Sequence, residues 1–420
     1  MLFLLLSTIL GSNLNADELN IDHGRYLSLD NAVKIALENN PKLDIKRSRF
    51  NASLQVPDYV SALPEPRLML NAVNLPLDNF SLNQSPMTQL QVGLSQELPY
   101  PGKLALKKEV AEQEALASKE GINNTSQLIV HRTKYLWWQL FYLDRSMDTV
   151  TGNIELLKEF IDVAETKYTV GQGLQQEVLL AHVELAKLED NKLQIEAMRL
   201  KTQAALNTLL NRDVSIAIAI DKNVSRDLPD TRQLNLLIMQ AETERPDVRQ
   251  ALLQISAAER QIRLAEKDYY PNFKLGAIYG WRQDEIGLAS IQLSMNLPFN
   301  VEKRQDKKRD QRNQEWLEKK FALEDLRNTV EEEIHQALAD YTRARKQTKI
   351  YQERIIPQAN QTVESMLAGY QVNKVDFLSL LRSQVNLFNF QTQYWQALST
   401  ANQALASLEY AVGEGDIYEQ

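Results

Sequence analysis

Residues Tyr168 to Leu185 read YTVGQGLQQEVLLAHVEL, and residues Tyr370 to Leu387 read YQVNKVDFLSLLRSQVNL. The second stretch repeats the pattern of the first 202 positions later, without a gap. Gly171 and Asn373 share one aligned position, and both residue types can take the left-handed conformation that ends a helix. Because apolar residues recur at helical spacing on both sides, we expect the same turn between two helices twice.

The duplication extends outward from these two turns. Pro41 aligns with Pro246 at an offset of 205, and Lys103 aligns with Lys303 at an offset of 200. Offsets that drift by a few residues are typical of short insertions in loops. The sequence therefore predicts two homologous halves, residues 17–225 and 226–420, each with the order helix, strand, strand, long helix, return helix.

Composition excludes several classes of protein. The chain has 420 residues and a net charge of −8, and a negative chain is a poor candidate for binding nucleic acid. It contains no cysteine, which excludes disulfides, thiol catalysis and cysteine-ligated metals. Only 14 glycines and 13 prolines interrupt it, which favours long helices over compact domains.

The N-terminus resembles a secretion signal. An apolar run from Leu2 to Leu10 is too short to span a bilayer, and small and polar residues follow as far as Ala16. We expect a signal peptide over residues 1–16. A buried N-terminal helix is the alternative.

Four segments alternate with the period of a β-strand, at about residues 67–74, 88–97, 272–282 and 288–297. One face is apolar, and its members include Leu90, Val92, Leu94, Tyr279 and Trp281; the other carries Gln89, Gln91, Ser290, Gln292 and Ser294. Such alternation occurs where one side meets lipid and the other water, and also in a half-buried soluble sheet. The pattern alone favours the soluble sheet.

Long helices follow each pair of strands. Leu29–Asn40 is expected to form a short helix capped by Asp30, and a second is expected from Lys42 to about Val60. From Ile122 to Tyr168, mostly apolar residues recur in steps of four and three, the heptad pattern of helices packed side by side. A helix that starts near Lys103 would be about 100 Å long. We expect return helices over Leu174–Leu210 and Asp376–Val412.

Catalytic constellations are scarce, so we do not expect an enzyme. Glu332 and His335 have the spacing of a di-iron ligand pair, but a second such pair is missing from the sequence. No metal site or cofactor is therefore expected. The ionisable groups of interest are at the two turns: Tyr168, Glu177, Tyr370, Asp376 and Arg382. Solvated hairpin ends are the alternative interpretation of these residues.

Two tandem halves of this plan, with Tyr-x-Val-Gly at the first turn followed by Glu177-Val178-Leu179-x-Ala181, resemble the TolC family of outer-membrane efflux proteins. The resemblance covers about residues 27–412. The stretch Ser95 to Lys103, SQELPYPGK, is further similar to the heavy-metal branch of that family. The resemblance implies a mainly α fold with a small β part, in which three chains share a twelve-stranded transmembrane barrel above a periplasmic α-barrel.

The resemblance also implies function and partners. A homotrimer in outer-membrane lipid would passively conduct heavy-metal cations, drugs or other small molecules. It would act with a periplasmic adaptor and with an inner-membrane pump of the proton-driven resistance-nodulation-division type. The adaptor would dock on the two turns, which contain Val170, Gly171, Gly173, Leu174, Val372, Asn373 and Val375.

In the family, a tyrosine and acidic residues of the second turn narrow the entrance. Tyr370 matches that tyrosine, but the acidic positions hold Ser379 and Arg382, which leaves Asp376 as the candidate to compensate. Tyr168 and Glu177 of the first turn are expected at the same entrance. Two other hypotheses stay open. One is a soluble periplasmic coiled-coil scaffold or adaptor-like protein, and the other is a di-metal helical-bundle enzyme.

Overall fold

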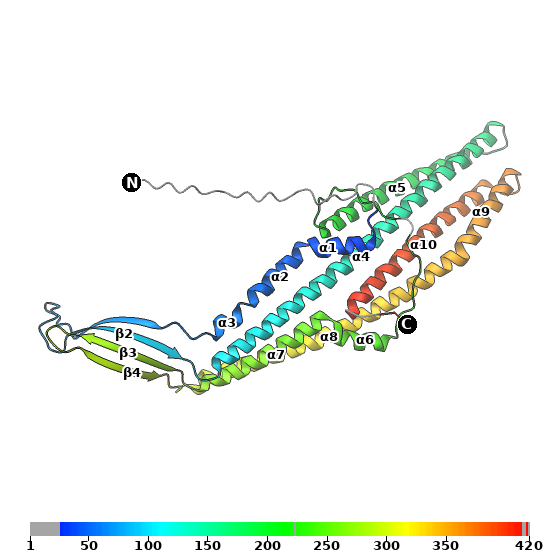
Figure 1. Cartoon of the computed structure of the whole chain (residues 1–420). Coiled ribbons are helices and arrows are strands. Elements are labelled where there is room, and N and C mark those ends of the chain that lie inside the picture. The colour runs from blue at the N-terminus through cyan, green and yellow to red at the C-terminus, as the bar shows by residue number, and fades with distance from the viewer. Residues whose placement is uncertain (1–25, 222–223, 414–416, 419–420) are drawn as a thin grey trace, which may run out of the picture.

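The computed structural model describes residues 26–221, 224–413 and 417–418, and the predicted signal peptide lies outside them. The molecule is elongated, with a small sheet at one end and the turns of two helical hairpins at the other (Figure 1). Short helices pack against the long ones about midway. Within the described ranges no helix is both long and apolar enough to cross a membrane.

The first hairpin consists of α4 (Lys103–Thr169) and α5 (Gln175–Leu209). The 67 residues of α4 form one unbroken helix, which is about 100 Å long at 1.5 Å per residue. Its heptad residues, for example Leu140, Val150 and Leu157, are buried, and α4 packs against α5, α7 and α10. The predicted start, length and seam of this helix are confirmed.

The second hairpin is less regular than the sequence predicts. Its outgoing arm divides into α8 (Gln305–Ile350), a π-helical turn (Tyr351–Ile355) and α9 (Ile356–Gln371), and α10 (Phe377–Val412) returns. Pro357 lies in the first turn of α9. Proline has no N–H to donate and its ring crowds the preceding turn, so the helix widens just before it.

The short helices also differ in detail from the prediction. Ser28, not Asp30, caps α1 (Leu29–Asn39), because its hydroxyl accepts a bond from the Asn31 amide at 3.3 Å. Asp30 lies within the first turn, where a negative charge favours the positive end of the helix.

The expected second helix is divided into α2 (Pro41–Ser53) and α3 (Val56–Ser61). The corresponding segment of the second half, α7 (Pro246–Glu266), runs unbroken after α6 (Leu234–Glu244). The difference has a local cause, since Pro57 occupies the first turn of α3 whereas Ile262 stands at the aligned position of α7. A single 3-10 turn, Lys267–Tyr269, then leads into the sheet.

Four antiparallel strands form one sheet in the order β1 (Arg67–Val73), β2 (Gln89–Leu98), β3 (Phe273–Trp281) and β4 (Leu288–Met295). These bounds lie within two residues of the predicted strands. The two halves of the chain join where β2 pairs with β3. The outer edges of β1 and β4 have no strand beside them among the described residues.

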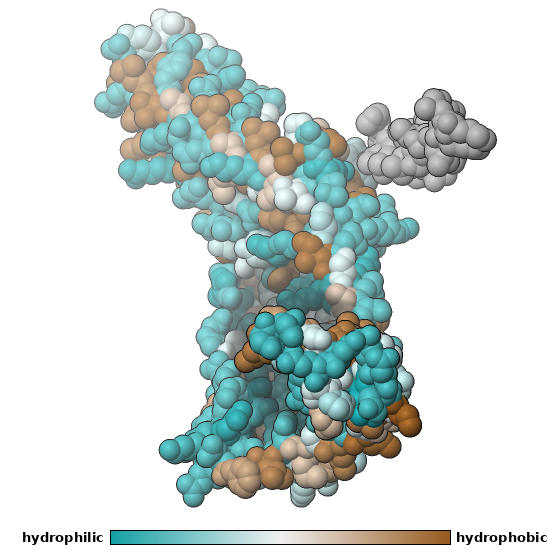
Figure 2. Space-filling view, turned by 90° about the vertical axis from the view of Figure 1, so that its left-hand side faces the viewer, coloured by the Kyte–Doolittle hydropathy of each residue, from teal (hydrophilic) through white to brown (hydrophobic). Residues whose placement is uncertain are grey.

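The register places the predicted apolar residues on one face. Val92 pairs with Tyr279, and Leu94 pairs with Ala277, which in turn pairs with Ile291. This face is uncovered, and Ile291 is 85% exposed. Hydrophobic residues gather along the lower rim of the near, strand end in Figure 2. An uncovered apolar face of this extent is expected to meet an apolar environment.

The opposite face carries the polar side chains that the sequence predicts, namely Gln89, Gln91, Ser290, Gln292 and Ser294. A glycine on this face allows two neighbouring strands to pack closely. Gly93 on β2 approaches Ile278 on β3 so closely that an added Cβ would lie 3.0 Å from its side chain.

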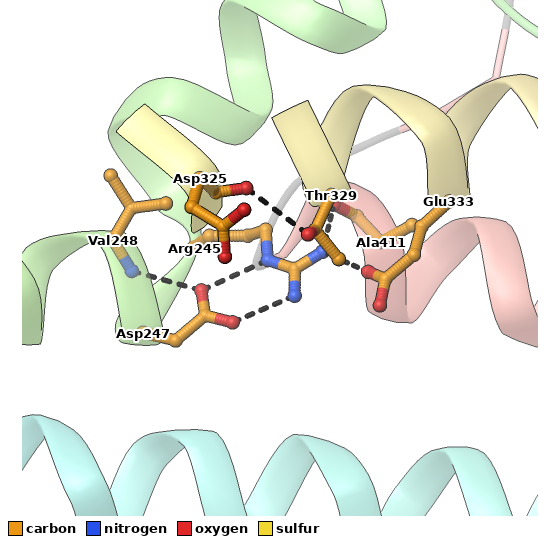
Figure 3. A network of polar contacts seen from close by, with 7 residues as sticks. All are labelled: Arg245, Asp247, Val248, Asp325, Thr329, Glu333 and Ala411. Carbon is orange, nitrogen blue, oxygen red and sulfur yellow. Dashed lines mark hydrogen bonds and ion pairs between the residues drawn. The ribbon is translucent and has the colours of Figure 1, made fainter. Parts of the chain in front are cut away.

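A buried arginine joins three helices near the middle of the molecule (Figure 3). Arg245, whose side chain is 4% exposed, binds Asp247 through two nitrogens at 2.9 and 2.7 Å and also binds Glu333 of α8. It donates to the carbonyl of Ala411 near the end of α10 at 3.2 Å. Burial alone would lower the pKa of the guanidinium, but the two carboxylates raise it above its ordinary value. Arg245 therefore stays charged and paired.

The first half holds a neutral version of this contact. Asn40, aligned with Arg245, donates to the carbonyl of Leu209 at 2.9 Å, and Leu209 aligns with Ala411. Each donor directly precedes the proline that begins a helix, and each acceptor lies at the end of a return helix. The duplicated contact fastens the short helices to the ends of both hairpins.

Candidate functional site at the hairpin tips

The first turn has the backbone geometry that its sequence predicts. Gly171 has a φ of 75°, and its amide donates to the carbonyl of Tyr168 at 3.0 Å. The Gln172 amide donates to the carbonyl of Lys167 at 2.8 Å. These bonds satisfy the last carbonyls of α4 and reverse the chain.

The second turn repeats this geometry. Asn373 has a φ of 60°, its amide donates to the carbonyl of Tyr370 at 3.2 Å, and the Lys374 amide donates to the carbonyl of Gly369 at 2.9 Å. Asparagine tolerates the left-handed conformation better than most residues with a side chain. The prediction of two equivalent turns at Gly171 and Asn373 is confirmed.

Asp376 caps α10. Its carboxylate accepts bonds from the Ser379 amide at 2.9 Å and the Ser379 hydroxyl at 2.7 Å. These bonds lower the pKa of Asp376. The carboxylate is thus engaged with its own helix, so two predicted entrance residues form a local pair.

Tyr370 is buried, with 3% of its surface exposed. Its ring lies 5.4 Å from that of Phe377, and its hydroxyl donates to Glu177 of α5 at 3.4 Å. Burial, with the nearby Glu177 carboxylate, raises the pKa of Tyr370 to about 12. Tyr370 is therefore not a solvated residue of a hairpin end. It joins the second hairpin to the first.

Sequence reasoning missed Lys167. Its ammonium group donates to the carbonyl of Tyr370 and to Asn373 Oδ1, the latter at 2.7 Å, and lies 4.0 Å from the centre of the Tyr370 ring. The only sequence signal is a difference between the repeats, since Gly369 stands where the first half has Lys167. The lysine holds the two turns side by side.

The remaining tip residues are largely exposed. Val170, Val372 and Leu174 are 63%, 62% and 56% exposed, and Tyr168 is 46% exposed. Arg382 is exposed on α10, while Gly173 and Val375 are partly covered. The tips thus present apolar side chains above the network of Lys167, Tyr370 and Glu177.

Gly173 is expected to tolerate no side chain. A Cβ there would lie 2.9 Å from the backbone nitrogen of Tyr168. We expect Gly173→Ala to destabilise the protein by about 1–3 kcal/mol, as overpacking does. The matched control is Gly152→Ala in α4, because a Cβ there would have no atom within 4 Å apart from the neighbouring backbone of its own helix. Denaturant unfolding compares the two, and equal stability would contradict the turn geometry.

The residues weighed as metal ligands lie apart from this site. His335 is about half exposed on α8, with Glu331 at 4.0 Å. In residues 26–221, 224–413 and 417–418, no three histidine or acidic side chains are grouped closely enough to hold a metal ion.

Comparison with known families decides the chain's identity. The pattern of the family described as outer membrane efflux protein matches residues 32–212 and 237–414, which covers most of both halves. The chain belongs to this family. It is accordingly a protein of the outer membrane, and the predicted family and fold class are confirmed.

Solved structures share the fold of this outer membrane efflux protein. The outer membrane protein VceC from Vibrio cholerae is 17% identical, with a TM-score of 0.78, over 92% of this chain and 96% of that one. CusC, whose structures concern folding and transmembrane channel formation, is 17% identical, with a TM-score of 0.77, over 92% of each chain. The open state of the MtrE outer membrane channel of Neisseria gonorrhoeae is 17% identical, with a TM-score of 0.77, over 92% of this chain and 88% of that one.

One similar sequence is an uncharacterized protein of Haemophilus influenzae, 23% identical over 281 residues. The match spans 64% of this chain and 62% of the length of that protein.

Proposed function

We propose that this outer membrane efflux protein is a passive exit duct, and that three copies close one continuous channel. The supporting observation is that both layers of the molecule end in open edges. The sheet ends at β1 and β4, and the long helices follow one another as α5, α4, α10 and α9 (Figure 1). Four strands cannot close a barrel, and open edges in a bilayer would leave backbone groups unpaired at several kcal/mol each.

The two faces of the sheet support the same proposal. Three copies in a ring would give twelve strands, with the apolar face of Leu90, Val92 and Leu94 toward lipid. The face of Gln89 and Gln91 would then line water. The register carries this alternation across all four strands.

The hairpin tips are proposed as the entrance. In one chain, Lys167 and Glu177 of the first hairpin hold Tyr370 of the second, so the two hairpins cannot separate without breaking these contacts. Asp376 and Ser379 cap α10 and shape the same end. The exposed apolar side chains of Val170, Leu174 and Val372 offer a surface on which a periplasmic adaptor could dock.

The proposed substrates are small molecules that an inner-membrane pump delivers. The proposed pump is driven by protons. The stretch Ser95 to Lys103 gives no direct support for heavy-metal cations. Tyr100 stacks on Tyr270 at 4.5 Å, and Lys103 binds Asp268 at 3.1 Å and Asn272 at 2.9 Å. These contacts join the sheet to α4, so the stretch has a structural use.

Loosening the tip is expected to raise channel conductance. Tyr370→Phe keeps the buried ring but removes the bond to Glu177, and a bond to a charged acceptor contributes about 1.5–3 kcal/mol. We expect the open fraction to rise roughly tenfold in planar bilayers. Tyr168→Phe is the comparison at the aligned position of the first turn: Tyr168 is 46% exposed and its hydroxyl has no bond to a described residue, so a much smaller change is expected. Unchanged conductance in Tyr370→Phe would remove this residue from the entrance.

Alkaline pH provides a second test of the same contact. The folded protein holds the pKa of Tyr370 near 12, above its ordinary value of 10.0, so packing favours the protonated phenol. The stabilisation is present below pH 10 and is lost as pH rises toward 12. Conductance should rise over this window in the wild type, with a smaller rise in Tyr370→Phe.

The soluble scaffold is the second candidate function. It would require the apolar face of the sheet to be covered by another part of the protein. Family membership and the uncovered face both favour the duct.

A further inference from the structure

The outer face of α5 carries a second heptad seam with no partner helix among the described residues. Its members recur in steps of four and three, and all are exposed: Leu179, Val183, Ala186, Asp190, Leu193, Ala197 and Leu200. Leu193 and Leu200 are 64% and 63% exposed. Within its own chain α5 packs on α4 through the opposite face, where Ala181 is fully buried. A seam of this kind is expected to pack against another helix.

Asp190 is the one charged residue of this seam. Its side chain accepts a bond from Gln194 one turn later at 2.7 Å, and no cation contacts it within the described part of the chain. A carboxylate at a seam position is costly when a second helix covers it, unless that helix supplies a cation. A polar residue at such a position commonly fixes the register of paired helices.

The opposite edge of the molecule supplies a matching cation. Ile350, Arg354 and Pro357 follow one another in steps of four and three on the exposed side of the arm formed by α8 and α9. Figure 1 shows this arm and α5 on opposite sides of α4 and α10. The Arg354 side chain is exposed, with no ion pair to a described residue of its own chain.

Asp190 and Arg354 lie at similar distances from the hairpin tips, measured along their helices. Lys167 holds the two turns side by side, so heights can be counted from them. Asp190 lies 15 residues beyond Gln175, where α5 begins, and Arg354 lies 17 residues before Gln371, where α9 ends. At 1.5 Å per residue the heights are about 23 and 26 Å, a difference that an arginine side chain can span.

We propose that Asp190 of one copy pairs with Arg354 of the next copy and sets the register of α5 against α8 and α9. The occupant of the exposed seam is thus a second copy of this chain, and the inference rests on the proposed ring of three. In the same register Leu193 of one copy faces Ile350 of the next, so an apolar contact adjoins the ion pair. Arg354 lies within the π-helical turn, Tyr351–Ile355, and its side chain is exposed.

Charge exchange tests the pair. Asp190→Arg alone would bring two cations together, and Arg354→Asp alone would bring two carboxylates together. Each is expected to increase trimer dissociation in detergent, measured by light scattering on dilution, by roughly a hundredfold. The double variant should restore the trimer. Glu189→Arg with Glu353→Arg, one residue away from each position, is the control and should leave the trimer intact.

Cross-linking separates this inference from the proposed function. The chain has no cysteine, so Leu193→Cys with Ile350→Cys introduces the only thiols, and a short bismaleimide should join neighbouring copies. Either single variant should give no cross-linked trimer. If the wild type is a trimer but charge exchange fails to restore it, the ion pair is wrong and the ring stands. If the wild type is a monomer, both proposals fail.

Discussion

Arg245→Ala is expected to be the most damaging single substitution, lowering the free energy of unfolding by about 3–5 kcal/mol. Arg245 is the only cation that contacts Asp247 and Glu333 among the described ion pairs, and both carboxylates would be left partly buried without it. The end of α10 would also lose its bond at Ala411. Denaturant unfolding of the detergent-solubilised protein, followed by circular dichroism, measures the loss.

Arg327→Ala is the matched control. Arg327 is about half exposed and lies 3.8 Å from Glu242, so its pair is expected to contribute less than about 1 kcal/mol. Adding Asp247→Asn and Glu333→Gln to Arg245→Ala should recover part of the lost stability, because no carboxylate then stays unpaired. A loss no larger than that of the control would show that the network does not hold the three helices together.

Ile291→Lys is expected to prevent stable insertion in the outer membrane. Ile291 is near the middle of β4 on the uncovered apolar face, and a lysine facing lipid at the middle of a bilayer costs about 2–4 kcal/mol. In a trimer the cost would be incurred three times. The measurement is the amount of trimer extracted from outer membranes.

Gln292→Lys makes the same change at the next residue, on the opposite face of β4. That face is proposed to line water, so trimer yield should stay close to that of the wild type. Equal yields for the two lysine variants would contradict the assignment of lipid and water to the two faces.

The sequence was sufficient to predict the parts of the fold that have regular patterns. The heptad of α4 specifies one helix regardless of its surroundings, and the alternation around Val92 specifies a strand and its faces. Gly171 and Asn373 identify both turns because a left-handed residue ends a helix locally. Each of these signals depends on residues close together in the chain.

Features that depend on single residues or distant partners were harder to predict. Pro57 divides one helix while Ile262 leaves its counterpart whole, and Pro357 widens one turn, so the repeats diverge at single positions. Ser28 and Asp30 are both good caps, and only the backbone distinguishes them.

The candidate site shows the same limit. Tyr370 was expected to narrow the entrance, but the sequence did not indicate its contacts with Phe377 and with Glu177, which is 193 residues away. The contacts of Lys167 could not be predicted from its neighbours in the chain, because its partners belong to the other repeat. The outer seam of α5 is visible in the sequence only once the structure shows which face α4 covers.

The central claim is a channel of three chains in the outer membrane, and its most direct test is the mass of the protein in solution. Outer membranes should be extracted in detergent and the purified protein measured by light scattering with detergent mass subtracted. The account predicts a protein that needs detergent and has three times the mass of a single chain. A monomer or dimer that stays in solution without detergent would contradict it.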